Sequence, residues 1–432
     1  MHSIFKFLEM NCILQVLGKF NYEEVSYDIE NKEYKCKLAS EALQAHFKEY
    51  KVILLAPESL VALLAEDVNE AIELLKKPNE LKERIKNEVL KNNLLKSEFK
   101  IILMQSIGSY SLKANNNFTI NFKNDVNNVV IYLLLNFLEE LKDVEKIIAD
   151  TSSGHNIYVS SLIEALRLLL AYCKLKSYLQ QPRINIKLAF SPPIGQSKEN
   201  LYPINLYDYN VKAFFDFPVK EKVELLSKNA LTEIKKLEKK YLKPLNAIIS
   251  SGRIMFNAIK YNVPLAIFYK EIIELEKSVE EGEEMLKEIL YRIEEEKSIE
   301  SDGKISRIAL NRTAIVNMLL SLALTSSIKE FLSGISQATI KNIEDSFSRL
   351  YEKVGLGLNK RFLKRDLSKI KIEEDWKKIK SSSNDPRDFF AHSGLLKSFI
   401  DREKIDDEEI LLRYKPKKVN LIKKWLKNPE NY

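Results

Sequence analysis

Short apolar runs alternate with longer amphipathic stretches over the first half of the chain. Apolar runs of this length, ended by Gly, Pro or Asp, are typical of buried strands. We predict strands at residues 11–18, 51–56, 100–107, 146–150 and 183–190, and a small hairpin at 25–29 and 33–36. Apolar residues recur at helical spacing over 38–50, 58–77, 126–141 and 157–175. Strands that alternate with helices predict a mostly parallel sheet with helices on both faces.

The pattern changes at residues 191–197, where two prolines, a glycine and two serines form the clearest linker in the chain. Beyond residue 218, strand patterns nearly vanish, and amphipathic stretches occupy 220–241, 264–297, 304–333 and 338–354. The run 272–296 carries charges of both signs at helical spacing, which is typical of an exposed helix that could enter a coiled coil. We therefore divide the chain into an α/β domain at 1–192, an all-α connector at 193–300 and an all-α domain at 301–432.

Composition supports a folded chain of more than one domain. The 432 residues are too many for one ordinary compact domain, and 45% hydrophobic with 30% charged residues is too apolar for a disordered chain. The three cysteines, Cys12, Cys36 and Cys173, have no metal-binding spacing and suit a reducing compartment. No uninterrupted apolar stretch is long enough to span a membrane, and the first residues lack the apolar core of a secretory signal. We expect a cytoplasmic protein with no membrane partner.

The net charge of +7 is located at one end of the chain. Residues 360–432 hold 20 basic and 13 acidic side chains, which accounts for the whole excess. A local basic bias of this kind suits a polyanion such as nucleic acid. The alternative is a solvated lysine-rich surface without a partner.

The first candidate site is the loop that runs from Asp150 to Asn156, between a predicted strand and a predicted helix. Its residues are small and hydroxyl-rich, and Gly154 would let the backbone approach a ligand closely. Free N–H groups at a helix start favour an anion, and ligands of open α/β sheets bind at this edge. The loop matches neither a Walker motif nor a GxGxxG dinucleotide fingerprint. The alternative is an ordinary turn whose polar side chains only cap the helix.

The segment 17–22, after the first predicted strand, would face the same crevice. Lys19 adds a positive charge there, and Phe20 or Tyr22 could stack on a base. Two loops of this kind above one sheet could hold phosphate groups.

The second candidate site is a short helix near the C-terminus. Asp385 is a good N-cap, a proline follows it, and Gly394 is a good helix stop. Cleavage of RNA by its own 2′-hydroxyl requires proton transfer and a cation beside the phosphate, which His392 and Arg387 could supply without a metal. The two residues are five apart and project about 140° from each other on an ideal helix, so two copies across a dimer axis would form a better site. The alternative is a basic helix with no catalytic role.

Together, in this order and architecture, the two motifs resemble the CRISPR-associated CARF–HEPN ribonucleases of type III systems, the Csx family. Asp150, Thr151, Gly154 and Asn156 fit the CARF loop pattern of an acidic residue, a hydroxyl residue and then Gly-x-Asn. The HEPN pattern is Arg, a polar residue, a short gap and His, and the segment 387–392 fits it. The resemblance covers about residues 10–190 and the C-terminal domain.

The resemblance implies a Rossmann-like CARF sensor, a helical connector and an all-α HEPN ribonuclease domain. It implies a homodimer, or a higher oligomer, that binds a cyclic oligoadenylate, often the tetra-adenylate in archaeal members, and then cuts single-stranded RNA without a metal or cofactor. The implied catalytic residues are Arg387 and His392, with Asp388 orienting them. The implied ligand-binding residues are Gly18, Lys19, Asn21, Thr151, Ser152, Ser153, Gly154, His155 and Asn156.

Two other functions remain open at this point. A CARF-like transcriptional regulator that binds DNA would also explain the sensor loop, the helical second half and the basic C-terminus, but the Arg387–His392 pattern would then have no role. The hydroxyl-rich loop also permits degradation of the messenger as a side activity.

Overall fold

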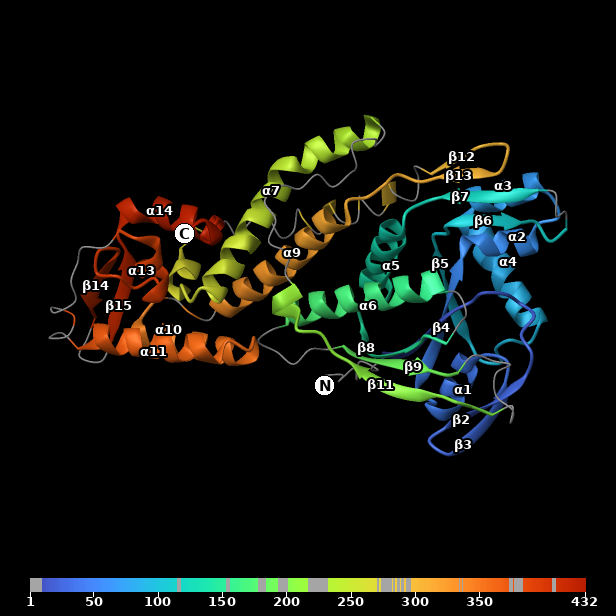
Figure 1. Cartoon of the computed structure of the whole chain (residues 1–432), viewed down its shortest axis with the longest axis horizontal. Coiled ribbons are helices and arrows are strands. Elements are labelled where there is room, and N and C mark those ends of the chain that lie inside the picture. Colours follow the sequence, from blue (N-terminus) through green and yellow to red (C-terminus); the bar gives the residue numbers. More distant parts are fainter. Residues whose placement is uncertain are drawn as a thin grey trace, which may run out of the picture.

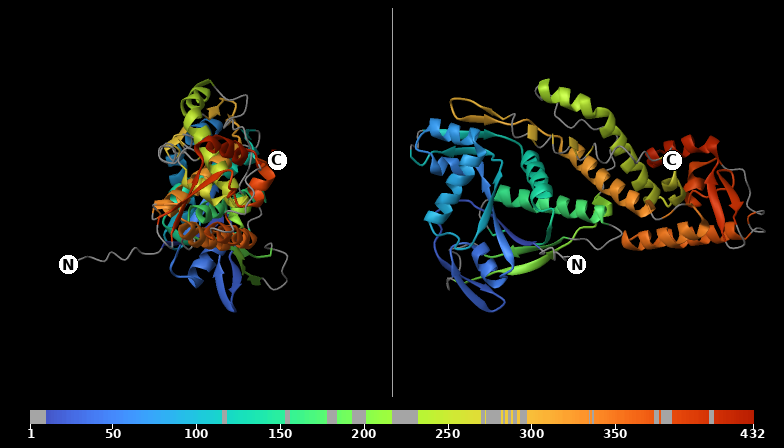
Figure 2. Two further views of the ribbon diagram at one scale, coloured as in Figure 1. Left: turned by 90° about the vertical axis from the view of Figure 1, so that its left-hand side faces the viewer. Right: turned by 180° about the vertical axis from the view of Figure 1, so that it is seen from behind.

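The protein is described here from a computed structural model. The model describes residues 10–114, 118–152, 156–177, 184–192, 201–216, 232–269, 297–333, 337–372, 384–405 and 409–432, together with a few single positions. The molecule is elongated, with a sheet-containing N-terminal domain and a smaller C-terminal domain at opposite ends of its long axis (Figures 1 and 2). Long helices run between the two ends.

A six-stranded sheet forms the centre of the N-terminal domain. Its order is β11-β9-β8-β1-β4-β5, and every pair is parallel except β11 with β9. The strands are β1 (Met10–Val16), β4 (Tyr50–Pro57), β5 (Phe99–Met104), β8 (Val144–Asp150), β9 (Asn185–Phe190) and β11 (Asn205–Tyr209). The five predicted strands are confirmed. The apolar runs of β1, β4, β5 and β8 are largely buried, whereas exposed and buried positions alternate over most of β9. The sequence prediction missed β11, an edge strand with exposed and half-buried positions.

Helices cover both faces of this sheet. Two separate hydrophobic clusters show the division: Leu54 packs with the helices of one face, and Leu14 with those of the other. The first face carries α1 (Ala39–His46), η1 (Glu58–Leu60), α2 (Val61–Leu64), α3 (Val68–Lys76) and α4 (Pro78–Lys91), and the second carries α5 (Val126–Glu140) and α6 (Asn156–Lys176). The single helix predicted over 58–77 is in fact three pieces. It breaks because Asp67 caps a new helix, accepting a hydrogen bond from the Glu70 N–H at 2.9 Å.

Two small sheets complete the N-terminal domain. The predicted hairpin is confirmed as β2 (Val25–Ile29) and β3 (Lys32–Cys36), and β10 (Leu201–Pro203) joins it. The second sheet has the order β12-β13-β7-β6. Its strands are β6 (Gly108–Ser111), β7 (Thr119–Lys123), β12 (Ser298–Ile299) and β13 (Lys304–Ser306). Segments from beyond residue 200 therefore add strands to this domain, and the predicted helix over 304–333 begins only at residue 312.

The remaining chain is mainly helical. Its helices are η2 (Ala213–Asp216), α7 (Thr232–Lys260), η3 (Pro264–Phe268), α9 (Arg312–Ser333), α10 (Ile340–Lys353), α11 (Gly357–Lys371), α13 (Pro386–Ala391), α14 (Pro416–Lys427) and η4 (Pro429–Asn431). An antiparallel hairpin, β14 (Ile400–Lys404) with β15 (Ile410–Tyr414), departs from the all-α expectation for the C-terminal domain. Most of the charged run 272–296 lies outside the described residues.

One hydrophobic cluster connects the two ends of the molecule. It includes Leu133 and Leu166 under the sheet, Leu319 in α9, and Leu367 in the C-terminal domain. By length and composition alone, α6 and α9 could each cross a membrane, but 56% and 72% of their apolar windows are buried inside the fold. This burial is what core helices of a folded domain show.

Candidate functional site

The first candidate site lies at the carboxyl edge of the six-stranded sheet. Strands β1 and β8 are parallel neighbours, and Gln15 pairs in register with Asp150. The segment 17–22 and the loop that begins at Asp150 therefore leave the sheet side by side. The Asp150 carboxylate contributes to raising the pKa of Tyr22, although burial is the larger cause.

The loop after β1 is closed on itself by an aromatic side chain. The Gly18 N–H donates to the Tyr22 hydroxyl at 3.0 Å, and the Lys19 ammonium lies 5.2 Å from the centre of the Tyr22 ring. Lys19 and Asn21 are exposed. Phe20 is only 8% exposed and packs in the core, so of the two rings predicted to stack on a base only Tyr22 is partly open.

The loop after β8 is held by hydrogen bonds to the next strand. The N–H and the hydroxyl of Thr151 both donate to the carbonyl of Ala189, at 3.0 and 2.9 Å, and the Ser152 hydroxyl accepts from the Ser191 N–H at 2.9 Å. Asn156 is the exposed first residue of α6. The other predicted ligand residues of this loop, Ser153, Gly154 and His155, lie outside the described residues.

Asp150 is the buried acid of this edge. Its side chain is 1% exposed, and one carboxylate oxygen accepts from the Ser152 N–H at 3.1 Å. The other oxygen has no hydrogen-bond partner among the described residues. Burial raises the pKa of Asp150 to about 6.

Polar residues also follow β4 and β5, along the same edge of the sheet. The sequence prediction did not include them. The Ser59 N–H donates to the Ser106 hydroxyl at 2.8 Å. The hydroxyls of Tyr110 in β6 and Tyr158 in α6 lie 2.8 Å apart, and burial raises the pKa of Tyr110. Ser59 follows the proline that ends a buried strand, so the rule that ligands gather at carboxyl ends of parallel strands would have found it.

A buried ion cluster joins this edge to the connector. Glu58 pairs with Arg307, and the Lys297 ammonium lies 3.9 Å from the same carboxylate. All three side chains are at most 8% exposed. Because Arg307 lies between β13 and α9, the cluster ties the start of the long helix to the end of β4.

Side chains of α5 and α6 also hold the segment that leads into α9. The Asn128 side chain donates to the Ile308 carbonyl at 2.7 Å and accepts from the Leu310 N–H at 2.8 Å. Arg312 pairs with Glu164 of α6. The start of α9 is thus bound to three separate elements of the N-terminal domain.

The C-terminal candidate site is built on α13. As predicted, Asp385 caps the helix and accepts from the Arg387 N–H at 2.8 Å. Phe389 is fully buried against Phe399 and Trp425, which anchors the helix. The polar residues Arg387, Asp388 and His392 are exposed, and the Arg387 Nε donates to the Tyr432 main-chain oxygen at 3.0 Å.

The helix ends at His392, which is its C-cap. The next two residues, Ser393 and Gly394, adopt left-handed backbone angles with φ of 56° and 69°. A Cβ atom on Gly394 would lie 2.6 Å from the Val263 side chain and 2.9 Å from the Tyr414 hydroxyl. The predicted stop at Gly394 is therefore required both by backbone angle and by space.

A carboxylate that the sequence prediction did not single out lies behind His392. Asp366 of α11 is 5% exposed and accepts hydrogen bonds from the Ser393 hydroxyl at 2.9 Å and from Arg365 Nε at 3.0 Å. One of its oxygens lies 4.0 Å from His392 Nδ1. The sequence did contain a signal for this residue. Asp366 lies between Leu363 and Leu367 on the buried face of an amphipathic helix, where an acidic residue is unusual.

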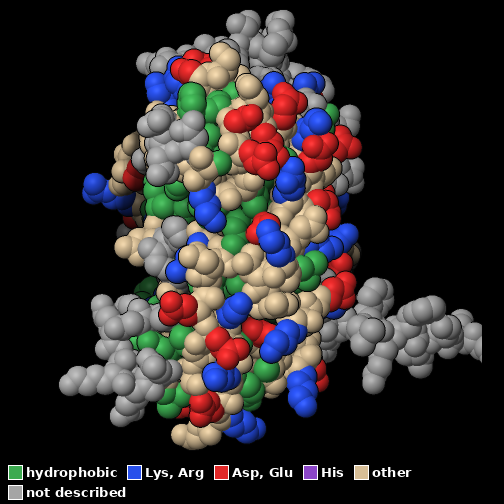
Figure 3. Space-filling view, turned by 90° about the vertical axis from the view of Figure 1, so that its right-hand side faces the viewer, with side chains coloured by type: hydrophobic (Ala, Val, Ile, Leu, Met, Phe, Trp, Pro, Cys, Tyr) green, Lys and Arg blue, Asp and Glu red, His purple; other side chains and the backbone are tan. Residues whose placement is uncertain are grey.

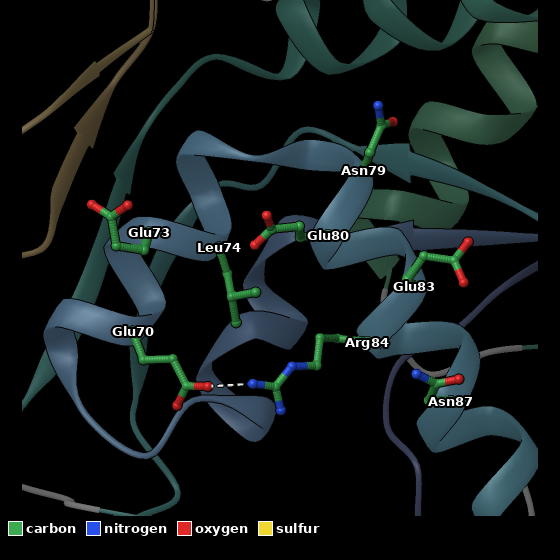
Figure 4. A pocket seen from close by; sticks show the side chains of 8 residues that line it. All are labelled: Glu70, Glu73, Leu74, Asn79, Glu80, Glu83, Arg84 and Asn87. Atoms are coloured by element: carbon green, nitrogen blue, oxygen red, sulfur yellow. Dashed lines mark hydrogen bonds and ion pairs between the residues drawn. The ribbon is translucent and has the colours of Figure 1, made fainter.

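The surface of the N-terminal domain carries charges of both signs. Acidic and basic side chains are interspersed on the face of the N-terminal domain that Figure 3 shows. A hollow of about 490 Å³ between α3 and α4 contains four glutamates (Figure 4). One of them, Glu70, pairs with Arg84 at 2.6 Å. A phosphate-rich ligand would be repelled there, so this hollow does not compete with the crevice at the sheet edge.

Comparison with known families gives two matches. The model for "CRISPR system endoribonuclease Csx1, CARF domain" matches residues 12–193. The model for "CRISPR system endoribonuclease Csx1, HEPN domain" matches residues 356–417. No curated protein matches the chain. The first match contains both loops of the sheet edge, and the second contains Asp366, Arg387 and His392.

Proposed function

The chain belongs to the CRISPR-associated CARF–HEPN ribonucleases, and we propose that it is a type III accessory endoribonuclease activated by cyclic tetra-adenylate. The two domains indicate a ribonuclease regulated by a ligand. The single observation that carries the finer proposal is the position of Arg387 and His392, exposed at the two ends of a firmly anchored helix inside the HEPN match. We further propose that the enzyme acts in the cytoplasm, in antiviral defence, on single-stranded RNA.

The proposed chemistry uses the ribose as its own nucleophile. His392 takes the 2′-hydroxyl proton, or protonates the leaving 5′ oxygen, and Arg387 stabilises the charge that develops on the phosphate. Asp388, exposed beside Arg387, would orient it. These groups need no metal for the reaction.

The proposed active form is a homodimer with one composite site. An exposed apolar stripe consists of Leu358 and Phe362 of α11 and of Ile372, which directly follows the helix, with exposed fractions of 64%, 45% and 52%. Helix positions three, four or seven residues apart lie on one side. Arg365 lies on the same side and donates to the Ala391 carbonyl, next to His392, at 3.5 Å. A second copy that covers this stripe would bring its own Arg387 and His392 near the first pair.

The proposed messenger site is the crevice at the carboxyl edge of the sheet. Its candidates are Gly18, Lys19, Asn21 and the residues of the loop 151–156. The first N–H groups of a helix such as α6 have no partner within the helix and would favour phosphates. A cyclic ligand with two-fold symmetry would contact both protomers of the dimer alike.

Activation requires a physical connection between the two sites. The Glu58–Arg307 pair links the carboxyl edge of the sheet, where we propose that the messenger binds, to the start of α9. Helix α9 in turn packs along α7. At the end of α7, Asn262 donates to the Ser393 hydroxyl at 2.8 Å, beside His392. We propose that the messenger selects one arrangement of these helices.

Incubation of labelled single-stranded RNA in EDTA, with and without cyclic tetra-adenylate, tests the function. We expect Arg387→Ala and His392→Ala to lose about 10²–10⁴-fold in cleavage rate, as for removal of a general acid–base or transition-state donor. Arg413→Ala is the control, because it removes an exposed arginine of the same domain that is paired with Glu403. Messenger affinity should be unchanged in all three variants. Wild-type cleavage by His392→Ala would refute the assignment, and intact RNA with tight duplex-DNA binding would favour a regulator.

A further inference from the structure

We propose that Asp366 is a positioning residue that holds the imidazole of His392 in its catalytic orientation and tautomer. The proposal rests on the function proposed above, because His392 is assumed to transfer the proton. Asp366 itself is buried and would not touch RNA. It would act through His392 alone.

The surroundings of Asp366 form a built site. The Asp366 side chain is only 5% exposed. A buried carboxylate is costly unless it is hydrogen-bonded, and both of its oxygens accept hydrogen bonds. Oδ2 accepts from the Ser393 hydroxyl at 2.9 Å, and Oδ1 accepts from Arg365 Nε at 3.0 Å. Oδ1 is also the atom that lies 4.0 Å from His392 Nδ1. The hydrogen bonds from Ser393 and Arg365 therefore hold the carboxylate in place, and the His392 ring lies next to it.

The orientation of the ring determines which nitrogen is available to RNA. Nδ1 faces the buried acid, and the His392 side chain as a whole is 48% exposed. A proton on Nδ1 would be held toward the carboxylate, which leaves the lone pair of Nε2 free to accept the 2′-hydroxyl proton. The 4.0 Å separation is longer than a hydrogen bond, and catalytic contacts of this kind often tighten when substrate binds.

A second contact holds the backbone on which His392 sits. Ser393 has a left-handed φ of 56°, which is unusual for a residue with a side chain. Its hydroxyl donates to Asp366 and accepts from the Asn262 amide at 2.8 Å. Asn262 follows the end of α7, so one row of hydrogen bonds connects that helix end to the residue after His392. Asp366 thus fixes both the ring and the turn that carries it.

Asp366→Asn is the principal test, because asparagine keeps the shape and removes the charge. We expect kcat for RNA to fall about 10–10³-fold with KM changed less than about 2-fold, since an isosteric replacement at such a position misplaces the proton rather than the substrate. Glu344→Gln is the matched control. It removes a carboxylate that also contacts α11, through Lys364 at 3.4 Å, and should leave kcat and KM unchanged.

Nitrogen NMR of ¹⁵N-histidine protein supplies a readout that does not depend on activity. The chain has four histidines, and His392→Ala assigns the signals of His392. We expect the neutral ring of wild type to carry its proton on Nδ1, and Asp366→Asn to shift the population toward the Nε2 tautomer. A wild-type ring protonated on Nε2 overturns the proposal, and so does an Asp366→Asn protein with wild-type kcat.

The two proposals fail in different ways. If wild type cuts no RNA, the ribonuclease function is wrong, while the tautomer of His392 still reports on Asp366. If Asp366→Asn raises KM and leaves kcat and the ring signals unchanged, Asp366 is only structural and the positioning role is wrong. If Asp366→Asn does not fold, the wild-type tautomer decides.

Discussion

The two candidate sites are built in opposite ways. At the sheet edge, the polar groups are tied into the fold: both donors of Thr151 are bound to Ala189, and Asp150 is almost completely buried. On α13, the proposed chemical groups Arg387 and His392 stand exposed, and only the carboxylate behind them is buried.

The difference suits the two tasks. Loops that hydrogen bonds fix before a ligand arrives need little further ordering, which lowers the free-energy cost of binding. Exposed groups on a short helix cannot exclude water or surround a phosphate by themselves. Each chain therefore orders its own half of the proposed messenger site, whereas the exposed groups of the α13 site need a second copy to surround a phosphate.

The turn at Ser393 and Gly394, directly after α13, gives the largest expected effect on stability. We expect Gly394→Ala to destabilise the C-terminal domain by about 2–5 kcal/mol, because it adds a backbone penalty to a steric clash. The added Cβ would lie 2.6 Å from Val263, and φ is +69°. Urea denaturation measures the effect.

Gly355→Ala separates the two causes. Gly355 also has a left-handed φ, +79°, but nothing lies within 4 Å of its Cβ position. Only the backbone penalty of about 1–2 kcal/mol should remain. Equal losses in the two variants would show that the contacts with Val263 and Tyr414 do not support the turn.

The buried acid of the sheet edge offers the next test. The pKa of Asp150 is raised from its usual value near 4 to about 6 by burial, so the folded protein holds this proton more tightly than the unfolded chain. The stabilisation is complete below pH 4 and is lost as the pH rises through 6. Asparagine does not ionise and escapes this loss. Relative to wild type, the free energy of unfolding of Asp150→Asn should therefore rise by up to about 3 kcal/mol between pH 4 and pH 7.

Denaturation at several pH values, compared between wild type and variant, measures this gain. Asp143→Asn is the control, because it removes an exposed carboxylate just before the same strand. A similar gain in Asp143→Asn would mean that burial of Asp150 is not the cause.

The same contrast explains what the sequence could predict of the fold. The strands of the sheet were predictable because runs such as 51–56 are apolar on both faces, and burial on both faces leaves a continuous signal. The added strands β10 to β15 are short or lie at edges, where two to five residues give no clear period. Their pairing depends on distant partners: β13, for example, pairs with β7, and the paired residues Lys304 and Asn121 are 183 positions apart.

The site was predictable only where chemistry follows a local motif. Arg387 and His392 are close in sequence, and Asp385 and Gly394 mark the helix that carries them. Asp366 and Glu58 are different, because each becomes significant through a residue distant in the chain. Pattern analysis shows an acid on an apolar face, but only the folded chain shows what it contacts.

The last and smallest expected effect concerns the link between the two sites. Glu58→Gln removes the charge that holds Arg307 and Lys297 at the carboxyl edge of the sheet. If this cluster transmits the signal, stimulation of RNA cleavage by cyclic tetra-adenylate should fall about 5–150-fold, the usual size of an allosteric coupling. Basal cleavage and messenger affinity should each stay within about 3-fold, because neither site loses a contact group.

Glu70→Gln provides the matched control in the same domain. It also breaks a Glu–Arg pair, at 2.6 Å with Arg84, but this pair is on the surface in the acidic hollow between α3 and α4 (Figure 4). Surface pairs contribute little, so stimulation should be unchanged. Equal stimulation in Glu58→Gln and Glu70→Gln would place the link in the other contacts at the start of α9, which are the Asn128 hydrogen bonds and the Arg312–Glu164 pair. In that case a signal from the sheet edge would enter α9 through α5 and α6.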